Sequence, residues 1–284
     1  MVSTAEGVKL IAAETGRLKE HLRGANPGDW RLDSPCEGWV VGDVIGHLGW
    51  AADFFARAIS AGKSGIISAP VGLPEIGSIP PAELPAYIAQ MAKGYSQSAG
   101  AGLVDVFSAS VDHLGAVLSE MQDDDWSKAC WGLRQIQPAA AYVPIRISEV
   151  VIHSWDIRFP SDSNAGLSPD CVAPVLDRLP VWLGSLGLAE FSPSEPAARY
   201  RFRTIGSADF QRDVVLKHQE NTENQENTVE DAEGEPAATF TCDADVLALL
   251  VWGRLQPKQV LADGRLTATP GYGTGHEFAT WLSR

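Results

Sequence analysis

Apolar residues recur at steps of three and four through much of the first 190 residues, and this spacing limits the possible folds more than any other feature. The clearest run lies within residues 39–59, at Val40, Val41, Val44, Ile45, Leu48, Ala51, Ala52, Phe55 and Ile59. Such spacing places these side chains on one face of an α-helix. Similar patterns predict helices over residues 4–23, over about 81–121 and from Pro144 onward. We therefore expect the chain to begin with a bundle of helices.

The pattern changes after about residue 190. Alternating polar and apolar residues predict half-buried strands at Arg199–Ile205, Val214–His218, Ala237–Cys242 and Gln259–Thr269. A short helix is expected after Asp243 and another over Phe278–Leu282. Residues 219–236 carry almost no apolar side chains and are expected to form a hairpin loop. The sequence thus predicts a helical domain over residues 1–190 and a small α+β domain over residues 191–284.

Composition excludes several kinds of partner. The formal charge of −14 and the pI near 4.8 argue against binding to nucleic acid or to an anionic membrane, both of which require clustered basic residues. The start of the chain lacks the pattern of a signal peptide, and no apolar run approaches 18 residues. The cysteines are widely spaced, as is usual for reduced thiols in the cytosol. We expect a cytoplasmic monomer or homodimer.

Glu149 and His153 are the strongest chemical signal. Residues four apart on a helix project from one face, about 5–6 Å apart at Cβ, so a carboxylate and an imidazole can bind one cation. His47, in the second predicted helix, can supply a third ligand from across the bundle. Two histidines and one carboxylate leave positions open for water or substrate, as catalytic zinc sites do, although iron, nickel or manganese would also suit these ligands. Asp43 and Asp156 are candidates to orient the histidines.

Other interpretations of these residues remain open. A Glu-x3-His pair is common on helices, and a single histidine such as His47 in an apolar helix more often packs in a core. The sequence gives even less support for a catalytic nucleophile. Ser148 and Ser154 lack a Gly-x-Ser-x-Gly motif, and Cys36 lies in a loop with no basic neighbour in the sequence.

Two stretches of the chain resemble the mycothiol-dependent maleylpyruvate isomerase family, within the DinB-like metalloenzymes. These are Pro35–Leu48, which contains Trp-x3-Asp-x3-His, and Glu149–Asp156, which contains Glu-x3-His-x-Trp-Asp. The runs Cys242–Leu255 and Leu261–Leu266 are similar to that family's C-terminal domain. The resemblance covers nearly the whole chain and implies a DinB-like four-helix bundle followed by a small sterol-carrier-like α/β domain.

The same resemblance implies a chemistry. In the family's pattern His47, Glu149 and His153 bind a divalent metal, usually Zn2+, and the metal holds a small thiol, mycothiol, as a thiolate. In the isomerase the thiolate adds to a double bond, permits rotation and leaves. In related transferases it stays on the electrophile or displaces a leaving group. We therefore expect a mycothiol-dependent S-transferase or isomerase that acts on a small electrophilic metabolite.

The positions of arginines bear on the substrate. Maleylpyruvate is a dianion, and the guanidinium fork suits carboxylates. No arginine lies between Arg57 and Arg134, a span that includes the third predicted helix. Arg254 and Arg265, in the family-like C-terminal motifs, are the candidate catalytic arginines. We expect an electrophile less anionic than maleylpyruvate. The alternatives are maleylpyruvate isomerase proper, a metal hydrolase and a non-catalytic binding protein.

Overall fold

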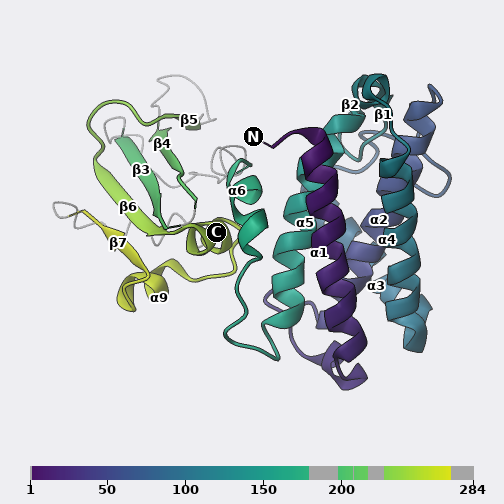
Figure 1. Ribbon diagram of the computed structural model, residues 1–284, viewed down its shortest axis with the longest axis horizontal. Helices are drawn as coiled ribbons and strands as arrows, with labels where there is room; N and C mark the ends of the chain where they lie inside the picture. The colour runs from purple at the N-terminus through teal and green to yellow at the C-terminus, as the bar shows by residue number, and fades with distance from the viewer. Residues whose placement is uncertain (1, 179–197, 207, 217–226, 270–284) are drawn as a thin grey trace. The chain divides into compact units, whose positions relative to one another are not determined.

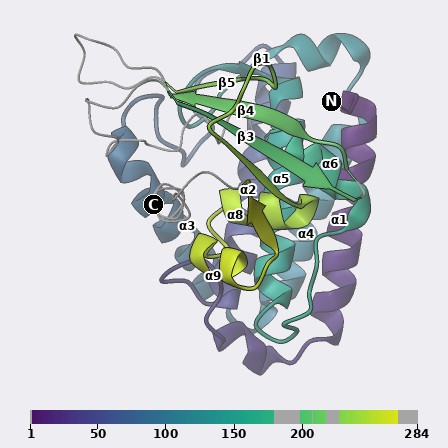
Figure 2. The same ribbon diagram turned by 90° about the vertical axis from the view of Figure 1, so that its left-hand side faces the viewer.

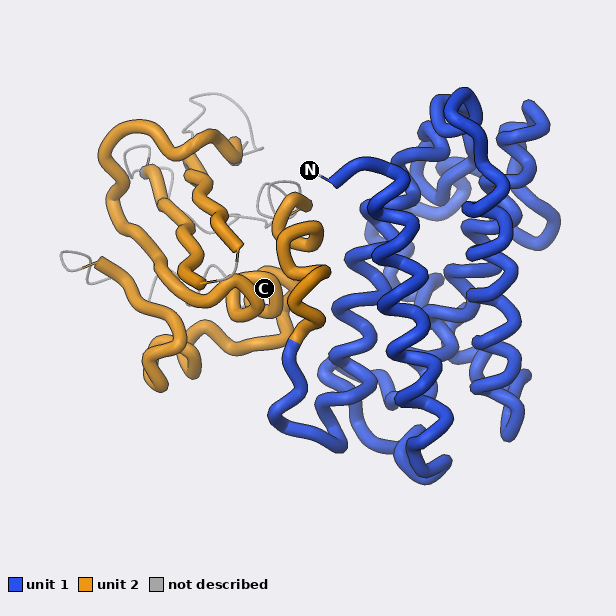
Figure 3. The backbone as a smooth tube through the Cα atoms, in the orientation of Figure 1, with its two compact units in different colours: residues 1–166 blue, residues 167–284 orange. Residues whose placement is uncertain are grey.

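The chain divides into two compact units, residues 1–166 and residues 167–284 (Figure 3). The computed structural model describes residues 2–178, 198–206, 208–216 and 227–269. The predicted domain boundary near residue 190 lies outside these residues. Each unit has its own core, so each is described by itself.

The first unit is helical (Figure 1). Its long helices are α1 (Thr4–Gly24), α2 (Val41–Lys63), α3 (Leu84–Ala99), α4 (Leu103–Ser119) and α5 (Tyr142–Arg158). Short 3-10 turns lie between them, at Pro27–Arg31, Pro81–Glu83, Gly100–Gly102, Asp123–Ser127 and Ala139–Ala141. A small hairpin precedes α5, and its strands β1 (Ala129–Cys130) and β2 (Gln137–Pro138) have two residues each.

Helix α2 runs through the middle of this unit and is buried along most of its length. It is antiparallel to α5, because His47 contacts Glu149 near one end while Phe55 packs on Tyr142 near the other. Small residues allow α3 to approach closely. A Cβ added at Gly46 would lie 2.4 Å from the carbonyl oxygen of Ala92. The backbone beside His47 is thus fixed by packing as well as by the helix.

Helices α3 and α4 are joined by a tight turn. Gly100 adopts φ 52°, which favours glycine, and Tyr95 Oη lies 2.7 Å from Ser110 Oγ. A straight helix would separate residues 15 apart by about 22 Å, so the chain reverses here. The stretch Pro81–Ser119 is long and apolar enough to cross a membrane by length and composition alone. Because it folds back on itself, it does not form one straight span.

The second unit combines a mixed sheet with short helices. The strands are β3 (Ala198–Ile205), β4 (Gln211–Leu216), β5 (Asn227–Asp231), β6 (Ala238–Asp243) and β7 (Leu266–Ala268). They lie in the order β5-β4-β3-β6-β7 (Figure 1), and Figure 2 shows β5, β4 and β3 side by side. Strand β3 pairs with β6 in parallel, while the other pairs are antiparallel. The helices are α6 (Pro169–Leu176), α8 (Ala244–Val251) and α9 (Pro257–Ala262).

A helical bundle followed by a smaller unit with a sheet is the fold class that the sequence predicts, and it is confirmed. Two local predictions were wrong in part. Residues 227–231, expected to lie in a polar loop, form β5, where Val229 pairs opposite buried Val214. Residues 259–262, expected to begin a strand, lie in α9, which starts at Pro257, because proline is well tolerated in the first turn of a helix. The helix expected at Phe278–Leu282 lies outside the described residues.

Candidate metal centre

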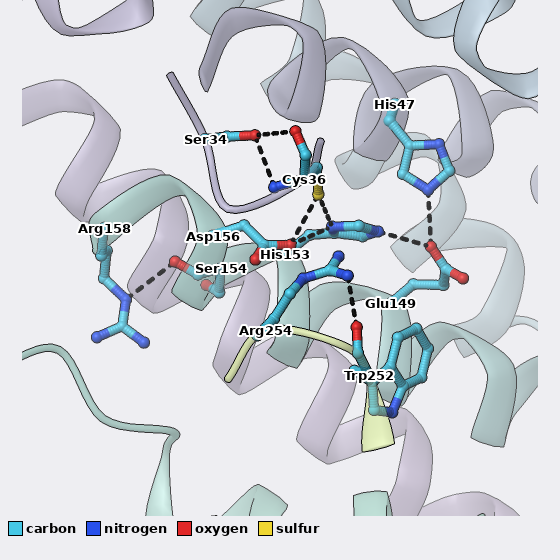
Figure 4. Close-up of polar contacts among 10 residues, drawn as sticks. All are labelled: Ser34, Cys36, His47, Glu149, His153, Ser154, Asp156, Arg158, Trp252 and Arg254. Carbon is cyan, nitrogen blue, oxygen red and sulfur yellow. Dashed lines mark hydrogen bonds and ion pairs between the residues drawn. The ribbon is translucent and has the colours of Figure 1, made fainter. Parts of the chain in front are cut away.

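One stripe of α5 carries the polar groups that face α2. Arg146, Glu149 and His153 stand at positions i, i+3 and i+7, so they follow one face of the helix. Across from this stripe His47 projects from α2 toward Glu149 (Figure 4). The antiparallel packing of the two helices therefore brings together residues that lie about a hundred positions apart in the sequence.

The three predicted ligands converge. Nε2 of His47 lies 2.7 Å from Oε2 of Glu149, and Nε2 of His153 lies 3.4 Å from the same oxygen. One ligand atom from each residue lies within 4.8 Å of the others. Two imidazoles and a carboxylate at this separation suit a divalent metal with open positions. The donor set therefore fits the metal that the sequence pattern implies.

The centre is largely buried, and Glu149 is its most exposed member. The side chains of His47 and His153 are 10% and 9% exposed, and that of Glu149 is 21% exposed. Trp39 and Trp50 lie against the His47 ring, with centroid distances of 5.6 and 6.5 Å. These apolar walls strengthen electrostatic interactions inside the site.

The pKa values of the three candidate ligands shift in different directions. Burial alone raises the pKa of Glu149, but its hydrogen bonds with His153 and His47 hold that pKa well below its ordinary value. Burial alone lowers the pKa of His153, but Asp156, Cys36 and Glu149 hold it well above its ordinary value. Burial lowers the pKa of His47. The ionised Glu149 thus places negative charge beside both imidazoles, as a cation site requires.

The outer edge of the His153 ring is held by Asp156. Nδ1 of His153 donates to Oδ2 of Asp156 over 2.8 Å, which leaves Nε2 directed at Glu149. The Cys36 thiol donates to the same carboxylate oxygen over 3.2 Å (Figure 4). The prediction that Asp43 orients His47 was wrong. Asp43 instead accepts from the backbone N–H of Val40 and caps α2.

Sequence reasoning missed the place of Cys36. A bridge between Asp33 and Val40 closes the loop that carries it, and Ser34 Oγ accepts from the Cys36 backbone N–H over 3.1 Å. The loop sets the thiol 3.9 Å from Nδ1 of His153. No local signal in the sequence points to this contact, because the two residues lie 117 positions apart.

The candidate arginines of the second unit are both engaged locally. Arg254 donates from Nη1 to the carbonyl oxygen of Trp252 over 2.6 Å. Arg265 binds the carboxylate of Asp263 through Nε and Nη2. Their assignment as catalytic residues stays a prediction.

The fold and the site define a helical-bundle protein with a centre of two histidines and one carboxylate. The chain belongs to the mycothiol-dependent maleylpyruvate isomerase family, because residues 11–158 match the family described as "Mycothiol maleylpyruvate isomerase N-terminal domain". The resemblance drawn from the sequence is thus confirmed.

Solved structures support the fold. The chain is similar to the crystal structure of the mycothiol-dependent maleylpyruvate isomerase, at a TM-score of 0.61 and 15% identity over 95% of both chains. A histidine-to-alanine mutant of that enzyme gives the same values. The apo form of sterol carrier protein 2 from Yarrowia lipolytica aligns over 45% of this chain and 89% of its own, at 15% identity and a TM-score of only 0.24. No curated protein matches the chain.

Proposed function

We propose that this protein is a metal-dependent enzyme that uses a small thiol, mycothiol, as the nucleophile toward a small electrophile. The reaction is S-transfer or cis–trans isomerisation. The observation that carries the proposal is the convergence of His47, Glu149 and His153, each with a ligand atom within 4.8 Å of the others, in a chain of the mycothiol-dependent family. Zinc is the metal that this donor set favours.

Each residue of the proposed metal site has its own role. His47, Glu149 and His153 would hold the metal. When bound, the metal supplies a positive charge that favours the thiolate form of a small thiol near neutral pH. Asp156 fixes the His153 ring so that Nε2 is available as a ligand. Trp39 and Trp50 exclude water from the His47 side of the centre.

The proposal is tested by measuring turnover with and without the thiol. Zinc-loaded protein is incubated with mycothiol and a panel of cis-alkene and alkylating electrophiles, and conjugates and geometric isomers are quantified. We expect activity only when both zinc and thiol are present. A rate that does not depend on thiol would instead indicate a hydrolase that uses water.

Two alanine variants sharpen this test. His153→Ala removes a metal ligand and is expected to lower turnover by more than about a hundredfold, beyond the loss typical of residues that only support ligands. His113→Ala is the matched control, because His113 is exposed on α4 and should leave turnover unchanged. Full activity in His153→Ala would overturn the proposal.

A further inference from the structure

Cys36, Asp156 and the Nδ1 edge of His153 form a second cluster of potential metal ligands, at the edge of the imidazole ring that does not face Glu149 (Figure 4). The Cys36 sulfur lies 3.2 Å from Oδ2 of Asp156 and 3.9 Å from Nδ1 of His153. The nitrogen and the oxygen lie 2.8 Å apart. Thiolate, imidazole and carboxylate are all ligands that zinc accepts. The cluster therefore has the donors of a metal site of its own.

The spacing of these three atoms is close to that of ligands around a single ion. Zinc bonds of about 2.0–2.3 Å in a tetrahedral arrangement separate neighbouring ligand atoms by about 3.4–3.6 Å. The three distances in the cluster depart from this range by about 0.6 Å or less. Small side-chain movements are therefore enough to bring all three atoms onto one ion, with a fourth position left for water.

The loop that carries Cys36 is held in place by its own hydrogen bonds. Ser34 Oγ accepts from the backbone N–H of Cys36 over 3.1 Å and donates to its carbonyl oxygen over 3.3 Å. The backbone N–H of Trp39 donates to the same carbonyl oxygen over 3.0 Å. Cys36 is partly exposed, whereas Asp156 and His153 are buried. The cluster thus meets solvent at the residue that carries the thiol.

The His153 ring links this cluster to the candidate metal centre. In a neutral imidazole one nitrogen carries the proton and the other has the lone pair that can bind a metal. Nδ1 of His153 donates to Asp156, so Nε2 faces Glu149 as the free ligand. An ion at Nδ1 requires the proton on Nε2 instead, where the Glu149 carboxylate lies 3.4 Å away and can accept it. The ring therefore serves one metal site at a time.

We propose that Sγ of Cys36, Nδ1 of His153 and the Asp156 carboxylate form a second metal site for a thiophilic divalent cation, and that an ion bound there deprives the metal centre of His153. Binding releases the thiol proton to solvent and moves the ring proton from Nδ1 to Nε2. Because thiolate is a soft ligand, the site favours soft ions. Only the competition rests on the proposed function, through metal binding at His47, Glu149 and His153.

Cadmium is the probe, because a thiolate bound to cadmium gives an ultraviolet charge-transfer band that nitrogen and oxygen ligands do not give. Metal-free protein is titrated with Cd2+ while this band is recorded. We expect a saturable band in wild type and no band in Cys36→Ser. Cys130→Ala is the matched control, because Cys130 is fully buried and belongs to no ligand cluster among the described residues. It should keep the band.

His47→Ala separates the two sites. It removes a ligand of the metal centre and leaves the three ligands of the cluster in place, so it should keep the cadmium band. In that background Cys36→Ser should weaken cadmium binding by more than about a hundredfold, beyond the loss typical of residues that only support ligands. Circular dichroism checks the fold of each variant. The comparison of wild type with Cys36→Ser stands even if His47→Ala does not fold.

NMR identifies the ring nitrogen that binds the ion. The protein is labelled with nitrogen-15 at histidine and loaded with cadmium-113, and the resonances of His153 are those that disappear in His153→Ala. We expect a coupling between cadmium and Nδ1 of His153, with the proton on Nε2. In zinc-loaded protein we expect the proton on Nδ1 and the metal on Nε2.

Two results would overturn the second site. One is a cadmium band that is missing in wild type or equally strong in Cys36→Ser, and the other is a cadmium ion coupled to Nε2 of His153. Neither result depends on thiol-dependent turnover. If cadmium binds at Nδ1 but zinc does not bind at Nε2, the proposed function fails and the second site stands.

Discussion

Asp156 binds the ring of His153 at Nδ1, on the edge opposite the one that faces Glu149. The carboxylate is fully buried and lies three residues after His153 on the same helix. One turn of α5 therefore contains both a candidate ligand and the group that orients it. Such support raises the basicity of a ligating imidazole and fixes its tautomer.

Asp156→Asn should weaken zinc binding by about 10- to 100-fold while the helix stays folded. The amide keeps the size of the carboxylate but removes its charge. The measurement is a competition titration against a chromophoric chelator. Cys36→Ser serves as the comparison, because it alters a donor to Asp156 and leaves the contact between Asp156 and His153 in place. If Asp156→Asn bound zinc as tightly as wild type, zinc binding would not depend on the orientation of the His153 ring by Asp156.

Gly46→Ala should destabilise the first unit by about 1–3 kcal/mol, the usual range for overpacking. The added Cβ would lie 2.4 Å from the carbonyl oxygen of Ala92, so α3 would have to move away from α2. Gly94→Ala is the matched control, since no atom outside its own neighbourhood lies within 4 Å of the new Cβ. It should stabilise by up to about 1 kcal/mol, because glycine is unfavourable within a helix. Urea unfolding of both variants measures the difference.

The acid limit of stability should depend on Asp125. Hydrogen bonds from Lys128 and from the backbone N–H of Gln122 lower the pKa of Asp125 to about 2. The unfolded value is near 3.9, so the unfolded chain binds a proton first as pH falls. The ionised carboxylate thus contributes stability above about pH 4, and the contribution is lost as pH falls toward 2.

Asp125→Asn should therefore flatten the acid side of the stability curve. The midpoint of urea unfolding, measured from pH 7 to pH 2.5, should fall less steeply in the variant than in wild type. Parallel curves would contradict this role for Asp125.

The helices and the pair formed by Glu149 and His153 could be predicted because their signals are local, whereas His47 was assigned through the resemblance of Trp-x3-Asp-x3-His to the family's pattern. The apolar spacing of α2 and the four-residue step from Glu149 to His153 are properties of single helices. The role of Asp156 also followed from its position on α5. By contrast, Asp43 was assigned to His47 although its place in the first turn of α2 equally favours capping, and the cap is what forms.

Cys36 and Arg146 could not be predicted because their roles depend on packing between distant segments. Cys36 meets Asp156 only once the loop before α2 is closed by the bridge from Asp33 to Val40. From the sequence alone Arg146 would be expected at the surface, because arginine side chains are rarely buried. Its burial follows from the antiparallel contact that places Leu48 against it.

The central claim is that a metal held by His47, Glu149 and His153 binds the sulfur of mycothiol. Its most direct test is the absorption spectrum of the cobalt(II)-loaded protein during titration with mycothiol. Cobalt(II) replaces zinc and reports a bound sulfur through a thiolate-to-metal charge-transfer band. The spectrum before thiol is added serves as the baseline, and Cys36→Ser excludes a contribution from the protein's own thiol. A saturable new band in wild type, absent in His153→Ala, is the predicted result. A protein that binds no cobalt(II), or binds it and gains no band with thiol, would contradict the account.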